Sequence, residues 1–234
     1  MPRRPVLRSI LQSVARARRA GRRPLVVLDV DDTVLSTAPR HLRIMAEFAA
    51  DRPRAKALLR VKPRQVGYFV VETAKTVGIK DESLLKELMG FWFKRFFTND
   101  YLLADEPVPG APEFCRRVVK EGGIPVYFTG RDETMRKGTV ASLVRHGFPE
   151  PRRGGDAWLV LKERFDIPDL KYKDEGLGRI KRRGQVVAGF ENEPAHINLF
   201  HDHCPDAVNV FVDTRHSGKP IAVKEHLPVI KDFR

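Results

Sequence analysis

Short apolar runs alternate with amphipathic segments along most of the chain. Runs composed almost entirely of apolar residues are typical of strands in a parallel sheet that is covered on both faces. The helical patterns between them complete a β-α-β alternation, which predicts an α/β fold with a doubly wound, Rossmann-like parallel sheet. Five strands are expected, at residues 25–30, 124–128, 157–161, 186–190 and 208–212.

Two helices between these strands have recognisable ends. The pattern at residues 112–121 begins with a proline in its first turn and stops at Gly122 and Gly123. Asp132 is a candidate N-cap for a helix that ends at Gly147. Each helix fits a crossover between neighbouring parallel strands.

A long helical segment interrupts the alternation after the first strand. About 90 residues separate Val30 from the second strand, far more than a crossover needs. Asp81 is a candidate N-cap for the last of its helices. We therefore expect a basic N-terminal helix (1–24), an α/β core (25–36 and 107–234) and an inserted all-α domain (37–106). The helices of the insert are expected at residues 40–50, 64–77 and 82–97.

An aromatic cluster lies in the last helix of this insert. Its helical spacing favours a hydrophobic core for the insert, and a lid over a substrate pocket or a subunit contact stays open as an alternative. The cluster consists of Phe91, Trp92, Phe93, Phe96 and Phe97.

Composition supports a folded protein without a membrane span. Hydrophobic residues make up 42% of the chain. No apolar run approaches the roughly 18 residues that a spanning helix needs. Only two cysteines occur, Cys115 and Cys204, which favours a reduced, cytoplasmic protein over a disulfide scaffold.

The charge is strongly basic and concentrated at the start. The formal net charge is +13, and residues 1–23 contain eight arginines and no acid. Val6, Ile10 and Val14 recur at helical spacing there, which favours a surface helix packed on the core. An organellar transit peptide and a contact with nucleic acid or a membrane surface stay open, whereas a secretory signal lacks its apolar segment.

Carboxylate, hydroxyl and basic residues follow or precede several of the expected strands. In an open α/β sheet, ligands bind beyond the carboxyl ends of the strands. The residues placed there are Asp29 and Asp31, then Thr129, Gly130 and Arg131, then Lys173 with Lys171 as an alternative, and Glu191.

This set suits transfer of a phosphoryl group. A carboxylate can accept phosphorus and form an acyl phosphate that water then cleaves. A carboxylate about 4 Å from a phosphate dianion is repelled by roughly 8 kcal/mol at an effective dielectric constant of 20, so the site needs a divalent cation and a lysine. Oxygen ligands from Asp29, Glu191 and a backbone carbonyl suit Mg²⁺. Asp31 is placed to protonate the leaving group and then activate water.

Four segments resemble the motifs of haloacid dehalogenase-like hydrolases, in the family's order. Residues 26–35 (VVLDVDDTVL) resemble the first motif and are similar in wording to acid-phosphatase-like branches. Residues 126–131 (VYFTGR) resemble the second, Lys173 the third, and residues 189–193 (GFENE) the fourth. The resemblance spans roughly residues 25–215.

By this resemblance each residue has an expected role. Asp29 is the nucleophile and a Mg²⁺ ligand, and Asp31 is the general acid and base whose carbonyl also binds the metal. Thr129, Gly130, Arg131 and Lys173 bind the phosphoryl group, and Glu191 completes the metal site. The insert occupies the place of the family's C1 cap, which closes over small phosphorylated substrates.

The fourth motif departs from the family's pattern. Phe190 stands where an aspartate beside Gly189 is common, and the acid four residues further on is missing. Compensating ligands could come from Glu193, Asn198 or Asp202. A zinc cluster of His196, His201, His203 and Cys204 is disfavoured because its spacing matches no recognised finger.

The sequence therefore predicts a Mg²⁺-dependent phosphatase that hydrolyses a phosphate monoester through an aspartyl-phosphate. A polynucleotide end phosphatase, a phosphotransferase and a non-catalytic binding protein stay open as alternatives. The substrate and the oligomeric state are left open as well.

Overall fold

The chain divides into two compact units. The computed structural model describes residues 3–234, with side chains from Pro5 onward. The sheet unit consists of residues 3–35, 107–133 and 143–234. The helical unit consists of residues 36–106 and 134–142, so the start of one later helix groups with the inserted segment.

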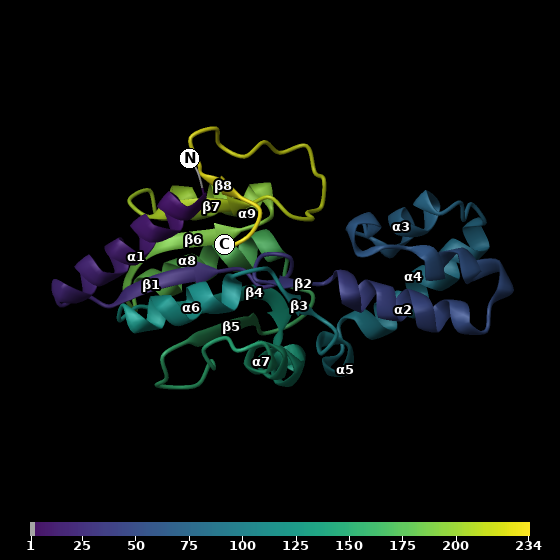
Figure 1. Cartoon of the computed structure of the whole chain (residues 1–234), viewed down its shortest axis with the longest axis horizontal. Helices are drawn as coiled ribbons and strands as arrows, with labels where there is room; N and C mark the ends of the chain where they lie inside the picture. The colour runs from purple at the N-terminus through teal and green to yellow at the C-terminus, as the bar shows by residue number, and fades with distance from the viewer. Residues whose placement is uncertain (1–2) are drawn as a thin grey trace. The chain divides into compact units, whose positions relative to one another are not determined.

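A six-stranded parallel sheet forms the centre of the sheet unit (Figure 1). Its strand order is β5-β4-β1-β6-β7-β8, so the α/β, doubly wound fold class is confirmed. The sixth strand is missing from the sequence prediction because two residues carry no periodicity. The strands are β1 (Pro24–Leu28), β4 (Ile124–Asp132), β5 (Trp158–Lys162), β6 (Gln185–Glu191), β7 (Val208–Val212) and β8 (Val229–Ile230).

Helices cover both faces of this sheet (Figure 1). Val26 and Leu28 of β1 face a core that α1 (Arg3–Arg19) and α6 (Ala111–Lys120) complete. Leu25 and Val27 face the opposite core, which α8 (Asp169–Lys181) and α9 (Pro194–His203) complete. All five residues of β1 are buried, which explains its uninterrupted apolar run.

The helix expected after Asp132 begins one short turn later, and the cap assigned to Asp132 stays a prediction. Asp132 is the last residue of β4 and pairs with Lys162 of β5. The chain then makes a short turn, η3 (Glu133–Met135), before α7 (Arg136–Arg145) begins. The end of that helix is as expected, because Gly147 adopts a positive φ of 75°.

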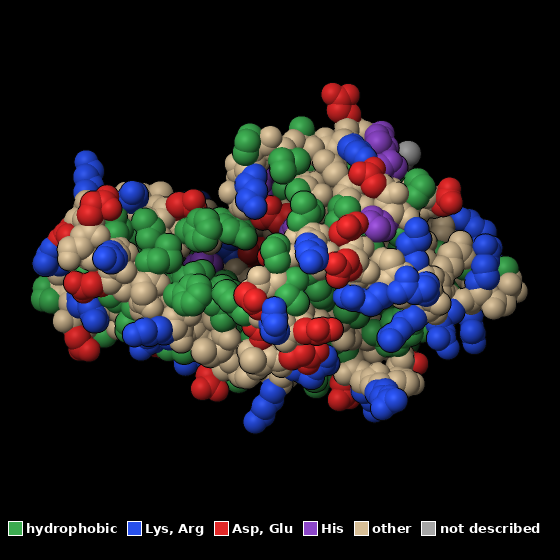
Figure 2. Space-filling model, turned by 180° about the vertical axis from the view of Figure 1, so that it is seen from behind, with side chains coloured by type: hydrophobic (Ala, Val, Ile, Leu, Met, Phe, Trp, Pro, Cys, Tyr) green, Lys and Arg blue, Asp and Glu red, His purple; other side chains and the backbone are tan. Residues whose placement is uncertain are grey.

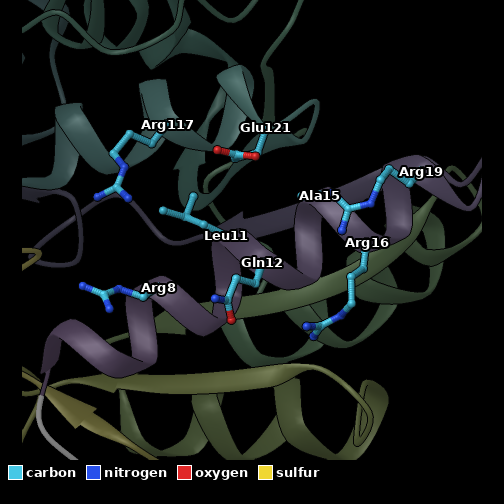
Figure 3. Close-up of a pocket in the computed structure, with 8 residues that line it drawn as sticks. All are labelled: Arg8, Leu11, Gln12, Ala15, Arg16, Arg19, Arg117 and Glu121. Atoms are coloured by element: carbon cyan, nitrogen blue, oxygen red, sulfur yellow. The ribbon is translucent and has the colours of Figure 1, made fainter.

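Helix α1 contributes its apolar face to the core. Val6, Ile10, Leu11 and Val14 are at most 5% exposed, as their helical spacing predicts. The helix lies beside α6, and its Arg8, Arg16 and Arg19 side chains point away from the core (Figure 3). No helix within residues 3–234 is long and apolar enough to cross a membrane.

The helical unit begins and ends at a short two-stranded sheet of β2 (Leu35–Ser36) and β3 (Glu106–Pro107). Asp81 caps α4 as predicted, because its side chain accepts hydrogen bonds from the backbone of Ser83 and Leu84. The other elements of the inserted segment are α2 (Ala38–Ala50), η1 (Pro53–Arg60), η2 (Pro63–Gln65), α3 (Val70–Thr76), α4 (Glu82–Phe96) and α5 (Asn99–Leu102).

The helix expected at residues 64–77 is wrong in its first half. Pro63 starts a single 3₁₀ turn, and Val66 is extended. The helix starts only at Val70, where the Glu72 side chain accepts a hydrogen bond from the Phe69 backbone N–H at 3.0 Å. A local capping contact therefore overrides the apolar periodicity upstream.

Aromatic side chains build the core of the helical unit. Trp92 is buried and stacks on Phe96 with ring centroids 4.4 Å apart. Phe93, on the next position of the helix, is 52% exposed. Figure 2 shows hydrophobic side chains gathered on the surface of this unit. Its large exposed apolar side chains are Leu59, Tyr68, Phe69, Phe93 and Leu103.

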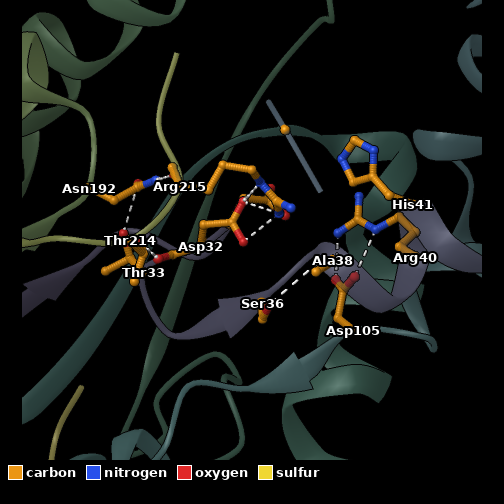
Figure 4. A network of polar contacts seen from close by, with 12 residues as sticks. Asp32, Thr33, Ser36, Ala38, Arg40, His41, Asp105, Asn192, Thr214 and Arg215 are labelled. Carbon is orange, nitrogen blue, oxygen red and sulfur yellow. Dashed lines mark hydrogen bonds and ion pairs between the residues drawn. The ribbon is translucent and has the colours of Figure 1, made fainter. Parts of the chain in front are cut away.

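A buried ion pair joins the two ends of the inserted segment (Figure 4). Arg40, near its start, donates to both carboxylate oxygens of Asp105, near its end, at 2.8 and 2.5 Å. Neither side chain is exposed. The guanidinium also lies 4.3 Å from the ring centroid of Phe96 and donates to its carbonyl. The pair thus ties the first helix of the segment to its exit.

Removing one partner of this pair should destabilise the protein strongly. The Asp105→Asn substitution leaves a buried guanidinium without its counter-charge, so the free energy of unfolding should fall by about 3–5 kcal/mol. Urea denaturation followed by circular dichroism measures it. Lys75→Gln, which removes an exposed pair with Glu82, is the control and should cost less than about 1 kcal/mol. Equal losses in the two variants would contradict the role given to Arg40.

Candidate active site

Three charged side chains that the sequence singled out meet at the carboxyl edge of the sheet. The Lys173 ammonium donates to Asp29 Oδ1 at 2.6 Å and to Glu191 Oε2 at 2.8 Å. Its third hydrogen bond goes to the Phe128 carbonyl oxygen at 2.8 Å. Lys173 and Glu191 are 1% exposed and Asp29 is 9% exposed at their side chains. One ammonium therefore serves two buried carboxylates.

The surrounding backbone holds these side chains in place. Asp29 directly follows β1, and its N–H donates to the Phe190 carbonyl of β6 at 3.0 Å. Glu191 ends β6, and its Oε1 accepts hydrogen bonds from the N–H groups of Asn192 and Glu193 at 3.1 and 3.2 Å. The second Asp29 oxygen, Oδ2, accepts no hydrogen bond from the described residues. It is the oxygen left for a ligand.

Helix geometry separates Lys173 from Lys171. Two residues apart on a helix, the side chains point in nearly opposite directions. Lys173 faces the sheet, whereas Lys171 is exposed and lies 3.9 Å from Glu175 on its own helix. The structure thus brings Lys173, and not Lys171, to Asp29.

The pKa values of the two carboxyl groups that share Lys173 shift in opposite directions. Burial and the charge of Glu191 raise the pKa of Asp29 from 3.8 to about 7, although Lys173 acts against this. Burial also opposes ionisation of Glu191, but Lys173 and His196 outweigh it and lower the pKa of Glu191 to about 2. Burial likewise disfavours the charged form of Lys173, yet the two carboxylates raise its pKa above the ordinary value. The site therefore holds more negative than positive charge.

Asp31 has a cation of its own. Arg131 donates to both of its carboxylate oxygens, with Nε···Oδ2 at 3.0 Å and Nη2···Oδ1 at 2.7 Å. The Arg131 side chain is 1% exposed, while Asp31 is 34% exposed and reaches solvent. A two-point contact of this kind fixes the plane of the carboxylate. Arg131 therefore orients the Asp31 side chain that was expected to bind the phosphoryl group's leaving oxygen.

The segment that carries Thr129, Gly130 and Arg131 bulges out of the sheet. Phe128 pairs with Val160 and Asp132 with Lys162, so three residues of β4 stand opposite a single residue of β5. Bulges redirect side chains and are common beside active sites. The Thr129 hydroxyl accepts a hydrogen bond from the Arg131 N–H at 3.2 Å and is buried at this edge.

Gly130 is required by a close approach. A Cβ at this position would lie 2.9 Å from a carboxylate oxygen of Asp169. Asp169 cannot easily retreat, because it accepts a hydrogen bond from the buried Lys162 ammonium at 2.8 Å. The glycine therefore allows the bulge and the start of α8 to lie against each other.

A further network at this edge was missed by the sequence analysis (Figure 4). Asp32 adopts a positive φ of 56°, which few non-glycine residues do. Arg215 donates to both of its carboxylate oxygens at 2.7 and 2.6 Å, and the Thr214 hydroxyl donates to its carbonyl. The Thr33 hydroxyl donates to Asn192 Oδ1 at 3.0 Å. The turn after β1 is thereby anchored to the segment that follows β7.

The residues proposed to compensate for the unusual fourth motif lie elsewhere. Glu193 accepts hydrogen bonds from the Ser217 N–H and hydroxyl at 2.6 and 2.7 Å. Asn198 bonds to the backbone of Ala222 and Lys224, and Asp202 pairs with Lys224. All three hold residues 213–228, and none contacts Asp29 in the described part of the chain.

The histidines and Cys204 do not form one cluster. His203 bonds to Asp174 at 2.6 Å, His201 lies 3.3 Å from His226, and His196 lies 3.8 Å from Glu191. Cys204 and Cys115 are both free and buried. Within residues 3–234 no group of three or more His, Cys, Asp or Glu side chains has the arrangement of a metal site.

The donor set nevertheless fits a hard divalent cation. Asp29, Glu191 and Asp31 contribute three negative charges, and Lys173 and Arg131 contribute two positive ones. Two oxygen-bearing side chains are enough for Mg²⁺, which usually keeps several water ligands. Burial, and then the negative charge of Glu191, raise the pKa of Asp29, so its ionised form is not fully compensated by Lys173. A bound divalent cation would compensate the negative charge of this site.

Comparison with known proteins identifies the fold. The sequence matches no protein-family model and no functionally curated protein. A candidate phosphatase from Clostridium difficile is 10% identical, and the match covers 83% of this chain and 87% of that one at a TM-score of 0.56. A predicted phosphoglycolate phosphatase from Haemophilus somnus is 14% identical, with 89% and 94% covered at a TM-score of 0.51. The chain has the haloacid dehalogenase-like fold.

Another solved structure with similarity is longer than this chain. The class C acid phosphatase from Bacillus anthracis is 16% identical, and 81% of this chain matches it at a TM-score of 0.44. The match spans only 63% of that protein's length. In this fold, Asp29 directly follows β1, a strand in the interior of the sheet.

Substitution of the two carboxylates that share Lys173 should change the stability of the protein in opposite directions. In EDTA, Asp29→Asn should make the protein more stable than the wild type at pH 8, because it removes a carboxylate whose pKa folding raises. The gain should shrink as the pH falls from about 7 to about 4, where the wild type takes up the proton. Urea denaturation at several pH values measures it.

Glu191→Gln is the matched comparison. Folding lowers the pKa of Glu191, so its ionised form stabilises the protein above pH 4.5 and this variant should be less stable than the wild type there. Destabilisation by both substitutions at pH 8 would show that Lys173 compensates both carboxylates fully.

Proposed function

We propose that the chain is a Mg²⁺-dependent phosphatase that hydrolyses phosphate monoesters through a phosphorylated Asp29. The observation that carries the proposal is the buried contact of Asp29 and Glu191 with one Lys173 ammonium at the tip of β1. A structural ion pair would be balanced, whereas this group leaves one negative charge uncompensated and one Asp29 oxygen without a hydrogen bond. Such a site is suited to a cation and an electrophile.

The proposed reaction begins with attack by Asp29. Its Oδ2 forms a bond to phosphorus while the bond from phosphorus to the ester oxygen breaks. Lys173 holds Oδ1 and thereby fixes the carboxylate plane during the attack. The Thr129 hydroxyl and the backbone N–H groups of the bulge are proposed to bind phosphoryl oxygens. The product is an acyl phosphate on Asp29.

Asp31 handles the proton in both half-reactions. It gives a proton to the departing alkoxide, and it then takes one from the water that attacks the acyl phosphate. The contact with Arg131 stabilises the ionised carboxylate, so it must loosen while Asp31 carries the proton. Arg131 is therefore proposed as a positioning residue, and its contact stabilises the carboxylate that remains after Asp31 has given its proton to the alkoxide.

Asp29, Glu191 and the carbonyl of Asp31 would hold the metal. When bound, Mg²⁺ would supply positive charge against the phosphoryl oxygens and so offset a repulsion of roughly 8 kcal/mol between Asp29 and a phosphate dianion. Lys173 alone cannot do this, because its charge is already divided between two carboxylates.

The helical unit is proposed as the cap that selects the substrate. The chain enters it at Ser36, only seven residues after the proposed nucleophile, so the two are close in the sequence. Its exposed aromatic side chains, among them Phe69 and Phe93, offer an apolar surface for the organic part of an ester. A small phosphorylated molecule is the proposed substrate class.

Substitution of the nucleophile tests the proposal. Asp29→Asn should reduce hydrolysis of 4-nitrophenyl phosphate in Mg²⁺ by at least about a thousandfold, because the amide cannot form the acyl phosphate. Release of 4-nitrophenol measures turnover, and beryllium fluoride should form an adduct with the wild type only. EDTA should stop the wild-type reaction, and added Mg²⁺ should restore it.

The outcomes of this test are separable. Far-ultraviolet circular dichroism shows whether the variant is folded. A folded Asp29→Asn protein that keeps a tenth or more of the wild-type rate would remove Asp29 from the mechanism. Restoration by Zn²⁺ but not by Mg²⁺ would reject the metal assignment alone.

The role of Asp31 predicts a dependence on the leaving group. Asp31→Asn should lower kcat/KM for an alkyl ester such as glycerol 2-phosphate by about 10²–10⁴-fold, and for 4-nitrophenyl phosphate much less, because nitrophenolate leaves without a proton. The ratio kcat/KM is chosen because it excludes the later hydrolysis step that both substrates share. Arg131→Gln, which removes the residue proposed to orient Asp31, should show the same leaving-group dependence with a smaller loss, because Asp31 itself remains. Equal losses in Asp31→Asn would assign Asp31 a structural role instead.

A further inference from the structure

A basic groove lies between α1 and α6, outside the proposed active site (Figure 3). Its volume is about 550 Å³, within the range of ligand sites. Four of the eight side chains that line it are arginines, Arg8, Arg16 and Arg19 from α1 and Arg117 from α6. Leu11 and Ala15 form an apolar floor, and Gln12 and Glu121 complete the lining.

The charge of this groove is not compensated within the described chain. No carboxylate lies within 4.0 Å of the guanidinium nitrogens of the four lining arginines, and Arg16 bonds only to Ser13. The next residue along α6, Arg116, is by contrast paired with Glu113 at 2.6 Å. The positive field of the groove therefore remains available to an anionic partner.

The structure disfavours a membrane as this partner. A helix that inserts into a bilayer surface needs a free apolar face. The apolar face of α1 is occupied, since Val6, Ile10 and Val14 are 3% exposed or less within the core of the sheet unit. What α1 offers to the groove is mostly arginine, with a small apolar floor of Leu11 and Ala15.

The kind of cation points to phosphate. Residues 1–23 contain eight arginines and no lysine. A guanidinium fork matches phosphate oxygens in two-point contacts, whereas a lysine would serve as well for diffuse attraction alone. We propose that this groove binds the phosphodiester backbone of single-stranded nucleic acid, with the sugars against Leu11 and Ala15. Because no aromatic side chain lines the groove, binding should show little base preference.

The proposal is tested by binding and does not depend on turnover. The probe is a fluorescently labelled 12-nucleotide oligouridylate without a terminal phosphate, and its anisotropy is measured in EDTA. With about four phosphates contacted, the dissociation constant should rise about 50-fold between 50 and 200 mM salt.

A triple variant and a matched control decide whether the groove is responsible. Arg8→Gln, Arg16→Gln and Arg19→Gln together should lower the logarithmic salt slope by about 2 and weaken binding at least about tenfold. Arg152→Gln, Arg153→Gln and Arg182→Gln remove the same charge from exposed positions outside the groove and should change the dissociation constant less than twofold. Both proteins should hydrolyse 4-nitrophenyl phosphate as the wild type does.

Each other outcome overturns the proposal. Equal weakening in the two triple variants would mean that net charge, and not the groove, attracts the oligonucleotide. Equally tight competition by polyglutamate of the same charge would identify an acidic protein segment as the partner. Salt-sensitive binding to phosphatidylserine vesicles in preference to the oligonucleotide would restore the membrane alternative.

Discussion

A single buried ammonium is the constraint on which the functional edge of this protein depends. An ionised lysine is costly to bury unless carboxylates and a carbonyl surround it, and Lys173 meets all three of its partners within 2.8 Å. These partners come from β1, β4 and β6, and the lysine itself from α8. The contact can form only when three neighbouring strands and a covering helix are in register, so the fold and the charged centre specify each other.

The same principle extends along the turn after β1. Its three aspartates each have a cation from a different part of the sheet unit: Lys173 of α8 contacts Asp29, Arg131 of the β4 bulge contacts Asp31, and Arg215 after β7 contacts Asp32. These pairs allow an acidic turn to stand at a buried edge without mutual repulsion. Asp29 shares its partner, Lys173, with a second buried carboxylate, Glu191. The uncompensated charge is thus concentrated on the one side chain proposed to bind metal and phosphorus.

The strands and the central residues could be predicted from the sequence because their signals are local. Five apolar runs predicted five strands. Polar residues at or after the apolar runs of three of them pointed to Asp29, Thr129 and Glu191. Arg215 was missed because its partner Asp32 lies 183 positions away and residues 213–228 carry no periodicity. The error at residues 64–77 has a local cause. Pro63 starts only a single 3₁₀ turn, and the Glu72 cap makes the helix begin at Val70. Contacts between residues far apart in the sequence, and helix starts that depend on one capping side chain, could not be predicted from the apolar periodicity.

The distribution of paired and unpaired arginines separates two sources of the basic charge. At the sheet edge, Arg131 and Arg215 are each held by a carboxylate, so they add little net field there. The apolar residues of α1 pack in the core of the sheet unit. Its Arg8, Arg16 and Arg19 have no acidic partner in the described chain. The net charge of +13 is therefore not explained by the need to bind a phosphate ester. A protein whose sheet edge balances its own arginines needs another reason for an arginine-lined helix, and an extended polyanion provides one.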